Sequence, residues 1–286
     1  MKVMMHTTTR LSDAFWRAAA YCLHPWVIAL SLAPLLIAAW LTYKLGQYFW
    51  EPAVDGVRMT LSSWHLIDML LGWLDYVGAA RFRAALAPLI VLALAVPVIV
   101  VLSLLLVALL MTPSLVRMVA ARRFVTLEKK RGATLLQSLG WSLWHALLAL
   151  LALLISLPFW LIPPLALIVP PLIWGWLGYK VFSFDVLAEH ASVAERRRLL
   201  REHKVPLMLL GVITGYLGAA PAAIWAFGVM AVALAPFLVL VSIWLYTLVF
   251  AFSTLWFAHY ALAALQDMRA RQAARTTPTI LEEQPA

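Results

Sequence analysis

The chain has 286 residues, of which 64% are hydrophobic and only 12% charged, and its mean hydropathy is +0.91. A composition this apolar excludes an ordinary soluble domain, and uncharged runs of 19, 33, 48 and 62 residues each exceed the roughly 18 that indicate a membrane helix. The net charge of +9 comes from basic residues that flank these runs, a pattern of membrane topology and not of nucleic-acid binding.

The first 23 residues are polar, and the Ser12-Asp13 pair predicts the cap of a short surface helix over 14–23. Pro25–Tyr43 follows as the first membrane span, because 19 uncharged residues give roughly 29 Å of helix against about 30 Å of hydrocarbon. Pro34 is expected to kink it. The run ends at Tyr43, before Lys44.

Residues 44–83 mix charged and apolar side chains, and we place them on the translocated side of the membrane. Apolar residues at helical spacing predict an amphipathic interfacial helix over 65–76. The second span is expected over 84–116, which exceeds one perpendicular crossing and therefore implies tilt, bending or an extension beyond the bilayer.

Residues 117–131 carry six positive charges and a single acidic residue, Glu128, which makes them the strongest cytoplasmic marker in the sequence. The segment runs through Gly132 into a helix expected to start near Thr134, so it also has the positive charge and N–H donors that an oxyanion site needs. We favour topology as the explanation and keep anion binding as the alternative. The candidate anion-binding residues of this segment are Arg122, Arg123, Lys129, Lys130 and Arg131.

Residues 132–179 are uncharged and must leave the cytoplasmic side and return to it, because the next charged segment is also basic. Five prolines between 158 and 171 argue against one regular helix. We therefore predict a hairpin with arms over 135–157 and 162–179, either crossing fully or re-entering the membrane. Broken backbone at membrane depth persists only where protein buries it or where it lines a watery cavity.

A charged island over 176–206 separates this hairpin from the next uncharged run. Ser192 and Glu195 have the spacing of a capping box, which predicts a chain break at 191–192 and a basic helix from 193 to about 205. Just before the break lies a candidate polar hub, for which a solvated connector is the favoured interpretation and a binding site the alternative. Its residues are Phe184, Asp185, Glu189 and His190.

Residues 205–266 predict a second hairpin that ends in a long helix over 237–265. Its Gly211-x-x-x-Gly215 spacing would allow close helix packing, although glycine is common in membrane helices and we favour that simpler reading. With every basic end on one side, we expect both termini to be cytoplasmic. Residues 1–268 would form a single membrane domain, and 269–286 a disordered cytoplasmic tail.

Candidate chemistry within the membrane segments is limited to two histidines, His145 and His259. We favour His145, which has tryptophans nearby, because His259 is close to the predicted interface. The sequence has none of the common hydrolase, metalloprotease or phosphate-loop spacings. Its single cysteine, Cys22, excludes an intramolecular disulfide. We therefore expect no enzyme activity, catalytic residue, cofactor or metal site.

The segment Gly178–Pro221, GYKVFSFDVLAEHASVAERRRLLREHKVPLMLLGVITGYLGAAP, resembles the signature of the CysZ-like family, which also contains the eukaryotic etoposide-induced membrane proteins. Phe184, Asp185, Glu189 and His190 match its motif, and a basic helix with Arg196–Arg198 follows. The order of an early span, a long second helix, a basic loop and two proline-rich hairpins is similar over roughly residues 11–265. Residues 112–137 are more basic than that family's pattern.

The resemblance implies an all-α bacterial inner-membrane protein with two full spans and partly inserted hairpins, often in oligomers, associated with sulfate uptake. We accordingly expect lipid and a small inorganic anion as partners, assembly into a homo-oligomer, and no nucleic acid. The alternative function is a non-transporting membrane scaffold or assembly factor.

Overall fold

The computed structural model describes residues 2–64, 69, 80–220 and 234–276, and these residues form helices joined by short connections, with no strand among them. The predicted all-α fold is confirmed. In chain order the helices are α1 (Lys2–Cys22), α2 (Pro25–Ser63), α4 (Ala80–Arg123), α5 (Leu135–Ser156), the short 3-10 helix η1 (Leu157–Leu161), α6 (Pro163–Ala188), α7 (Val193–Glu202), α8 (Lys204–Ala219) and α10 (Ala235–Thr276).

Four helical segments are long and apolar enough to cross a membrane, by length and composition: α2, residues 136–161, α6 and residues 237–274. The predicted second span over 84–116 lies within α4, which is one continuous helix of 44 residues. The amphipathic helix predicted over 65–76 and the turn of the second hairpin over 221–233 lie outside the described residues. The chain is therefore a polytopic α-helical membrane protein.

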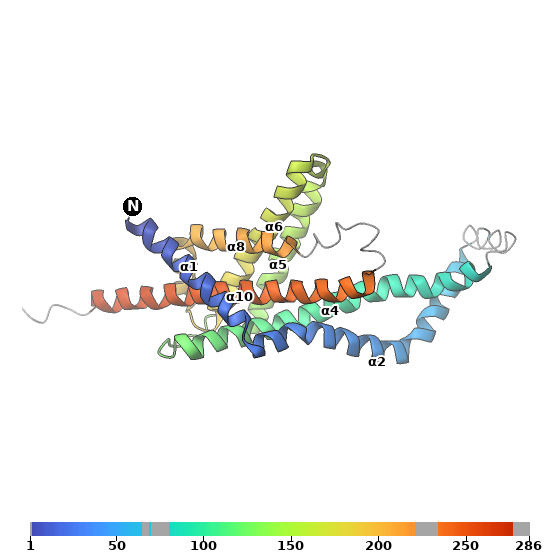
Figure 1. The fold of residues 1–286 in the computed structure, drawn as a ribbon, viewed down its shortest axis with the longest axis horizontal. Helices are drawn as coiled ribbons and strands as arrows, with labels where there is room; N and C mark the ends of the chain where they lie inside the picture. The colour runs from blue at the N-terminus through green and yellow to red at the C-terminus, as the bar shows by residue number, and fades with distance from the viewer. Residues whose placement is uncertain (1, 65–68, 70–79, 221–233, 277–286) are drawn as a thin grey trace, which may run out of the picture. The chain divides into compact units, whose positions relative to one another are not determined.

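The described chain divides into two compact units, residues 1–31 with 110–286, and residues 32–109. Within the smaller unit, the second half of α2 packs on the start of α4 around Val54, Ala87 and Val91. Within the larger unit, α6 and α8 pack extensively on each other, α5 packs on α6, and α1 packs along α10 (Figure 1). All the candidate site residues belong to this larger unit.

The first hairpin has arms close to the predicted ones, with a break between Pro158 and Pro163. Pro158 is the second residue of η1, and Pro163 opens α6 after Ile162 takes an extended conformation. Proline suits the first turn of a helix, where no backbone donor is lost. The five prolines do not lie in one regular helix, as expected, because the chain breaks between η1 and α6, while Pro170 and Pro171 lie inside α6. Pro171 is buried where α6 packs on α8, and proline inside a membrane helix is tolerated when neighbouring helices pack against it.

The amino-terminal helix begins at Lys2, so the predicted cap at Ser12-Asp13 is wrong. The Ser12 hydroxyl donates to the Thr9 carbonyl at 3.0 Å as an interior helical residue. Arg17 donates to both oxygens of Asp13, one turn earlier, at 2.9 Å each. Phe15 packs edge-on against Trp256 of α10, with ring centroids 5.0 Å apart. The bonds that Ser12 and Asp13 make within the helix, together with the packing of Phe15 on α10, favour a helix that continues without a break through residue 13.

The predicted break and capping box before α7 are confirmed, since the Ser192 hydroxyl accepts from the Glu195 amide and the Glu195 carboxylate accepts from the Ser192 amide. The helix ends at Glu202, earlier than the predicted 205. His203 leaves helical geometry there (φ −109°, ψ 25°), and its Nδ1 lies 2.9 Å from the Tyr260 hydroxyl on α10. This contact fixes the corner between α7 and α8.

A glycine seam, which we define as Gly175, Gly211 and Gly215, brings α6 and α8 together backbone to backbone. A Cβ on Gly211 would lie 2.3 Å from the Gly175 carbonyl oxygen, and one on Gly215 would lie 2.5 Å from the Pro171 carbonyl oxygen. No side chain fits at these distances. The Gly-x-x-x-Gly spacing therefore reflects close helix packing, and the simpler reading that we favoured is wrong.

We expect Gly211→Ala to destabilise the protein by about 1–3 kcal/mol, because the added methyl overpacks a rigid backbone contact. Gly218→Ala is the matched control on the same helix, since nothing lies within 4 Å of its added Cβ. It should be neutral or stabilise by up to about 1 kcal/mol, as alanine favours helix. Thermal unfolding in detergent measures both, and equal midpoints for the two variants would contradict the seam.

Candidate functional site

The basic loop between α4 and α5 docks on the corner between α6 and α7. The amides of Arg131 and Ala133 donate to the carbonyls of Glu189 and Ala188, at 2.9 and 3.1 Å. A Cβ on Gly132 would lie 2.1 Å from the Ala191 carbonyl oxygen, so only glycine allows this approach. Arg131 itself has a positive φ of 44°. The sequence thus places its densest positive segment directly on the polar hub.

Glu195 is the best-bonded carboxylate of this region. Its two oxygens accept from Arg269 Nε and Nη2 at 3.0 Å each, a bidentate pair, and one also accepts from Lys130 Nζ at 3.0 Å. The side chain is only 9% exposed. Burial alone would raise the pKa of Glu195, but hydrogen bonds from Arg269, the Ser192 amide and Lys130 lower it to about 2. The carboxylate therefore stays ionised at physiological pH.

Glu189 holds the other lysine of the loop. Its carboxylate accepts from Lys129 Nζ at 2.9 Å, and Arg117 Nε lies 3.9 Å away. Partial burial opposes ionisation, but the hydrogen bond and charge of Lys129 leave the pKa of Glu189 below its ordinary value. Two of the five candidate cations are thus neutralised by acidic residues of the hub and its neighbouring helix.

His190 contributes through its backbone. Its carbonyl oxygen accepts from Arg269 Nη2 at 2.7 Å and from the Lys130 amide at 3.4 Å. The imidazole is 1% exposed, and its Nδ1 has no hydrogen-bond partner among the described residues. Burial lowers the pKa of His190, which favours the neutral ring.

Asp185 and Phe184 join the start of α5 to α6 and α7. The Ser138 hydroxyl donates to the Asp185 carboxylate. The Phe184 ring stacks on Trp141 with centroids 5.0 Å apart, and the Arg196 guanidinium lies 4.2 Å from the Phe184 centroid. The start of α5 is itself fixed by a capping box between Thr134 and Gln137.

His145, the favoured intramembrane candidate, lies one turn beyond Trp141. It is 6% exposed, and its Nδ1 is 2.8 Å from the Trp141 carbonyl oxygen. Its ring centroid lies 4.2 Å from that of Trp141. These contacts are those of a packed helical histidine, and within the described part of the chain no hydrogen bond or ring contact joins His145 to the candidate cations of the basic loop.

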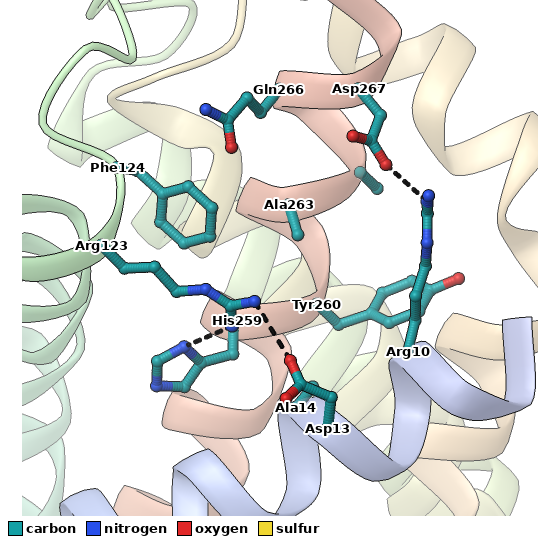
Figure 2. A pocket seen from close by; sticks show the side chains of 11 residues that line it. Arg10, Asp13, Ala14, Arg123, Phe124, His259, Tyr260, Ala263, Gln266 and Asp267 are labelled. Carbon is teal, nitrogen blue, oxygen red and sulfur yellow. Dashed lines mark hydrogen bonds and ion pairs between the residues drawn. The ribbon is translucent and has the colours of Figure 1, made fainter. Parts of the chain in front are cut away.

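Arg122 and Arg123, at the end of α4, have separate surroundings. Arg122 Nη2 lies 2.9 Å from His24 Nε2, and its guanidinium lies 5.8 Å from the centroid of the Tyr21 ring. Arg123 reaches into a pocket, where it contacts Asp13 at 3.1 Å and His259 at 3.4 Å (Figure 2). The candidate cations are therefore distributed over several local environments.

Arg269 is the residue of the hub that sequence reasoning missed. The predicted tail begins at this position, yet α10 continues to Thr276, and Arg269 is the bidentate partner of Glu195. Its Nη1 also donates to the Glu128 carbonyl at 2.8 Å. Helical periodicity continuing past 265 was the available signal, but nothing local identifies a partner 74 positions away.

The chain is an all-α membrane protein with several candidate spans. Its basic loop docks on the acidic residues Glu189 and Glu195, at the ends of the apolar segments. The pattern of the family described as Sulfate transporter CysZ/Etoposide-induced protein 2.4 matches residues 14–228. The chain belongs to this family, as its resemblance indicated. No curated protein and no solved structure matches the chain.

We expect Glu195→Gln to destabilise the protein by about 2–3 kcal/mol at neutral pH, because it leaves Arg269 without its bidentate carboxylate. The folded pKa is depressed, so the contribution of Glu195 is complete above about pH 4.5 and is lost as pH falls toward 2. Unfolding midpoints measured across this range should converge for the two proteins.

Glu202→Gln is the control for this prediction. Glu202 pairs with Arg198 at 2.7 Å, but both side chains are more than 40% exposed, so its loss should cost less than about 1 kcal/mol. A constant difference between the parent and Glu195→Gln from pH 7 to 2.5 would contradict the assigned role of the carboxylate.

Proposed function

We propose that this protein is a bacterial inner-membrane permease for a small inorganic oxyanion, with sulfate as the first substrate to test. The observation that carries the proposal is membership, over residues 14–228, of the family described as Sulfate transporter CysZ/Etoposide-induced protein 2.4. The helical membrane fold agrees with this transporter-type family. Assembly into a homo-oligomer within the lipid bilayer is part of the same proposal.

The electrostatics of the basic loop support anion attraction at two positions. Lys129 and Lys130 pair with Glu189 and Glu195, whereas Arg122 and Arg131 form no ion pair with a carboxylate in the described part of the chain. Arg131 is exposed. A guanidinium without a carboxylate attracts anions over about 10 Å at 0.1 M salt. We assign the cytoplasmic end of the anion route to these two residues, with the other loop cations holding the loop in place.

The second candidate function is a non-transporting scaffold. It is favoured by the same ion pairs, because Lys129, Lys130 and Arg123 all engage carboxylates. Cations whose partners are fixed within the protein stabilise structure and contribute less to a route for anions. The two functions are distinguished by anion flux across a membrane, which a permease produces and a scaffold does not.

We expect the protein in sulfate-loaded liposomes to release sulfate, and the double variant Arg122→Gln/Arg131→Gln to lower the rate several-fold at low salt. High salt should shrink the difference between parent and variant, because screening weakens the field of an exposed charge. The measurement is radiolabelled sulfate efflux at equal protein density, with insertion checked by protease accessibility.

Arg197→Gln is the matched control, an exposed arginine on α7 outside the loop. It should leave the flux near the parent value. No flux from the parent protein supports the scaffold instead. Equal flux from the double variant and the parent contradicts the roles of Arg122 and Arg131.

For topology we propose that both termini and the hub lie in the cytoplasm, because the basic segments all fall at the same ends of the apolar runs. A reporter that is active only in the periplasm, fused after Arg275, should give no signal. The same reporter inserted after Gly56, in the proposed translocated segment, should be active. Activity at the carboxyl terminus would refute this orientation.

A further inference from the structure

A pocket of about 270 Å³ lies where α1, α10 and the end of α4 meet (Figure 2). Its volume is close to the lower limit of small-molecule pockets, which are about 300–1,000 Å³. Charged groups from all three helices line it, and no local sequence pattern predicts that they converge. Neither Arg122 nor Arg131, the two residues of the proposed anion route, lines this pocket.

Two guanidinium groups reach the pocket from different helices. Arg10 of α1 and Arg123 of α4 approach it from opposite sides in Figure 2. Arg10 contacts Asp267 through Nη1 at 2.6 Å, and its side chain is 41% exposed. A guanidinium has five donor hydrogens, so one contact leaves Arg10 with donors for another acceptor. The exposure of this ion pair also gives a ligand a way in.

The charge of the pocket and its surroundings is positive. Asp267 pairs with Arg10, and Asp13 is shared between Arg123 and Arg17. The lining itself carries two guanidiniums and two carboxylates, and Arg17, which lies beside the pocket and not in its lining, is the third guanidinium. The bond from Arg17 is the main cause of a lowered pKa of Asp13, which keeps that carboxylate ionised. The excess of one positive charge favours an anion over a cation or a neutral ligand.

The remaining lining combines small apolar side chains and aromatic rings with two polar residues, Gln266 and His259. Three alanines, Ala14, Ala263 and Ala264, line the pocket together with the ring of Phe124. The Tyr260 ring also lines it, while its hydroxyl is engaged by His203 at 2.9 Å. The small side chains leave space that a bare tetrahedral ion would not fill. His259 also borders the pocket, 1% exposed, and its Nε2 has no hydrogen-bond partner among the described residues.

We propose that this pocket binds a small organic anion, a carboxylate on a short apolar body. The carboxylate pairs with the unused donors of Arg10 and with Arg123, and the apolar part lies against Ala263 and Phe124. Asp13 and Asp267 hold the two arginines in position. Because the site joins α1, α4 and α10, its occupation stabilises their packing. Binding at this site does not depend on whether the protein conducts anions.

The test is thermal unfolding of the full chain in detergent, at constant ionic strength, with four probes. Butyrate is the anion, butyramide its neutral counterpart, butylammonium its cationic counterpart, and sodium sulfate the inorganic anion. Butyrate should raise the unfolding midpoint with a saturable dependence in the millimolar range, because a ligand that binds only the folded state stabilises it. The other three probes should produce smaller shifts without saturation.

Three variants locate the effect. Arg10→Gln should weaken butyrate binding about tenfold by removing one charged donor. Ala263→Leu should abolish it by filling the space while retaining every charge. Arg58→Gln, which removes an arginine from an exposed ion pair on α2, should bind butyrate as the parent does. If Ala263→Leu fails to fold, the comparison of butyrate binding between Arg10→Gln and Arg58→Gln tests the proposal.

Several results would overturn the proposal. These are no saturable shift with butyrate, equal shifts with butyramide or butylammonium, a saturable shift with sulfate alone, and undiminished butyrate binding in Arg10→Gln. A saturable shift with sulfate alone would assign the pocket to the proposed anion route. Failure of the flux experiment leaves butyrate binding as a separate measurement, so the two proposals fail independently.

Discussion

The bidentate ion pair between Glu195 and Arg269 is the interaction on which the larger unit depends. It joins α7 to the end of α10, and through Lys130 it joins both to the loop that precedes α5. Removing two charges from water is costly, so such a pair persists only with good geometry and further hydrogen bonds. Here the Ser192 amide supplies one of them, and that same bond caps α7. The Glu195 carboxylate thus caps α7, holds the loop through Lys130 and joins α7 to α10 through Arg269.

The glycine seam supplies the complementary constraint on the apolar side. Ion pairs fix the polar ends of the helices, but they do not determine how closely two apolar helices approach within lipid. Between α6 and α8 that distance is set by Gly175 and Gly211, whose backbones are in contact. In a bilayer, van der Waals packing is a main source of helix association, since lipid tails solvate apolar side chains well. Helix α6 carries Gly175 of the seam and Phe184 and Asp185 of the hub, so the same helix takes part in both constraints.

Local sequence signals predicted the fold where the deciding interaction spans a few residues. The Ser192–Glu195 capping box and the break before Pro163 belong to this group. The start of α1 could not be predicted, because packing of α1 on α10 overrides the local capping preference of Ser12 and Asp13. The same limit applies to the candidate site. The sequence located the basic loop and the polar hub as separate features, but not Arg269, which joins them.

The ion pairs also change how a basic segment should be interpreted. A count of charges over residues 117–131 indicates a strongly positive surface, a pattern that is typical of the cytoplasmic ends of membrane segments. Pairing with Glu189, Glu195 and Asp13 divides those charges into groups with different physical effects. Paired lysines lock the loop and add little to the field beyond a few ångströms, whereas Arg122 and Arg131 retain theirs. In the proposed function, attraction of an anion depends on these two arginines, whereas the paired cations hold the loop in place.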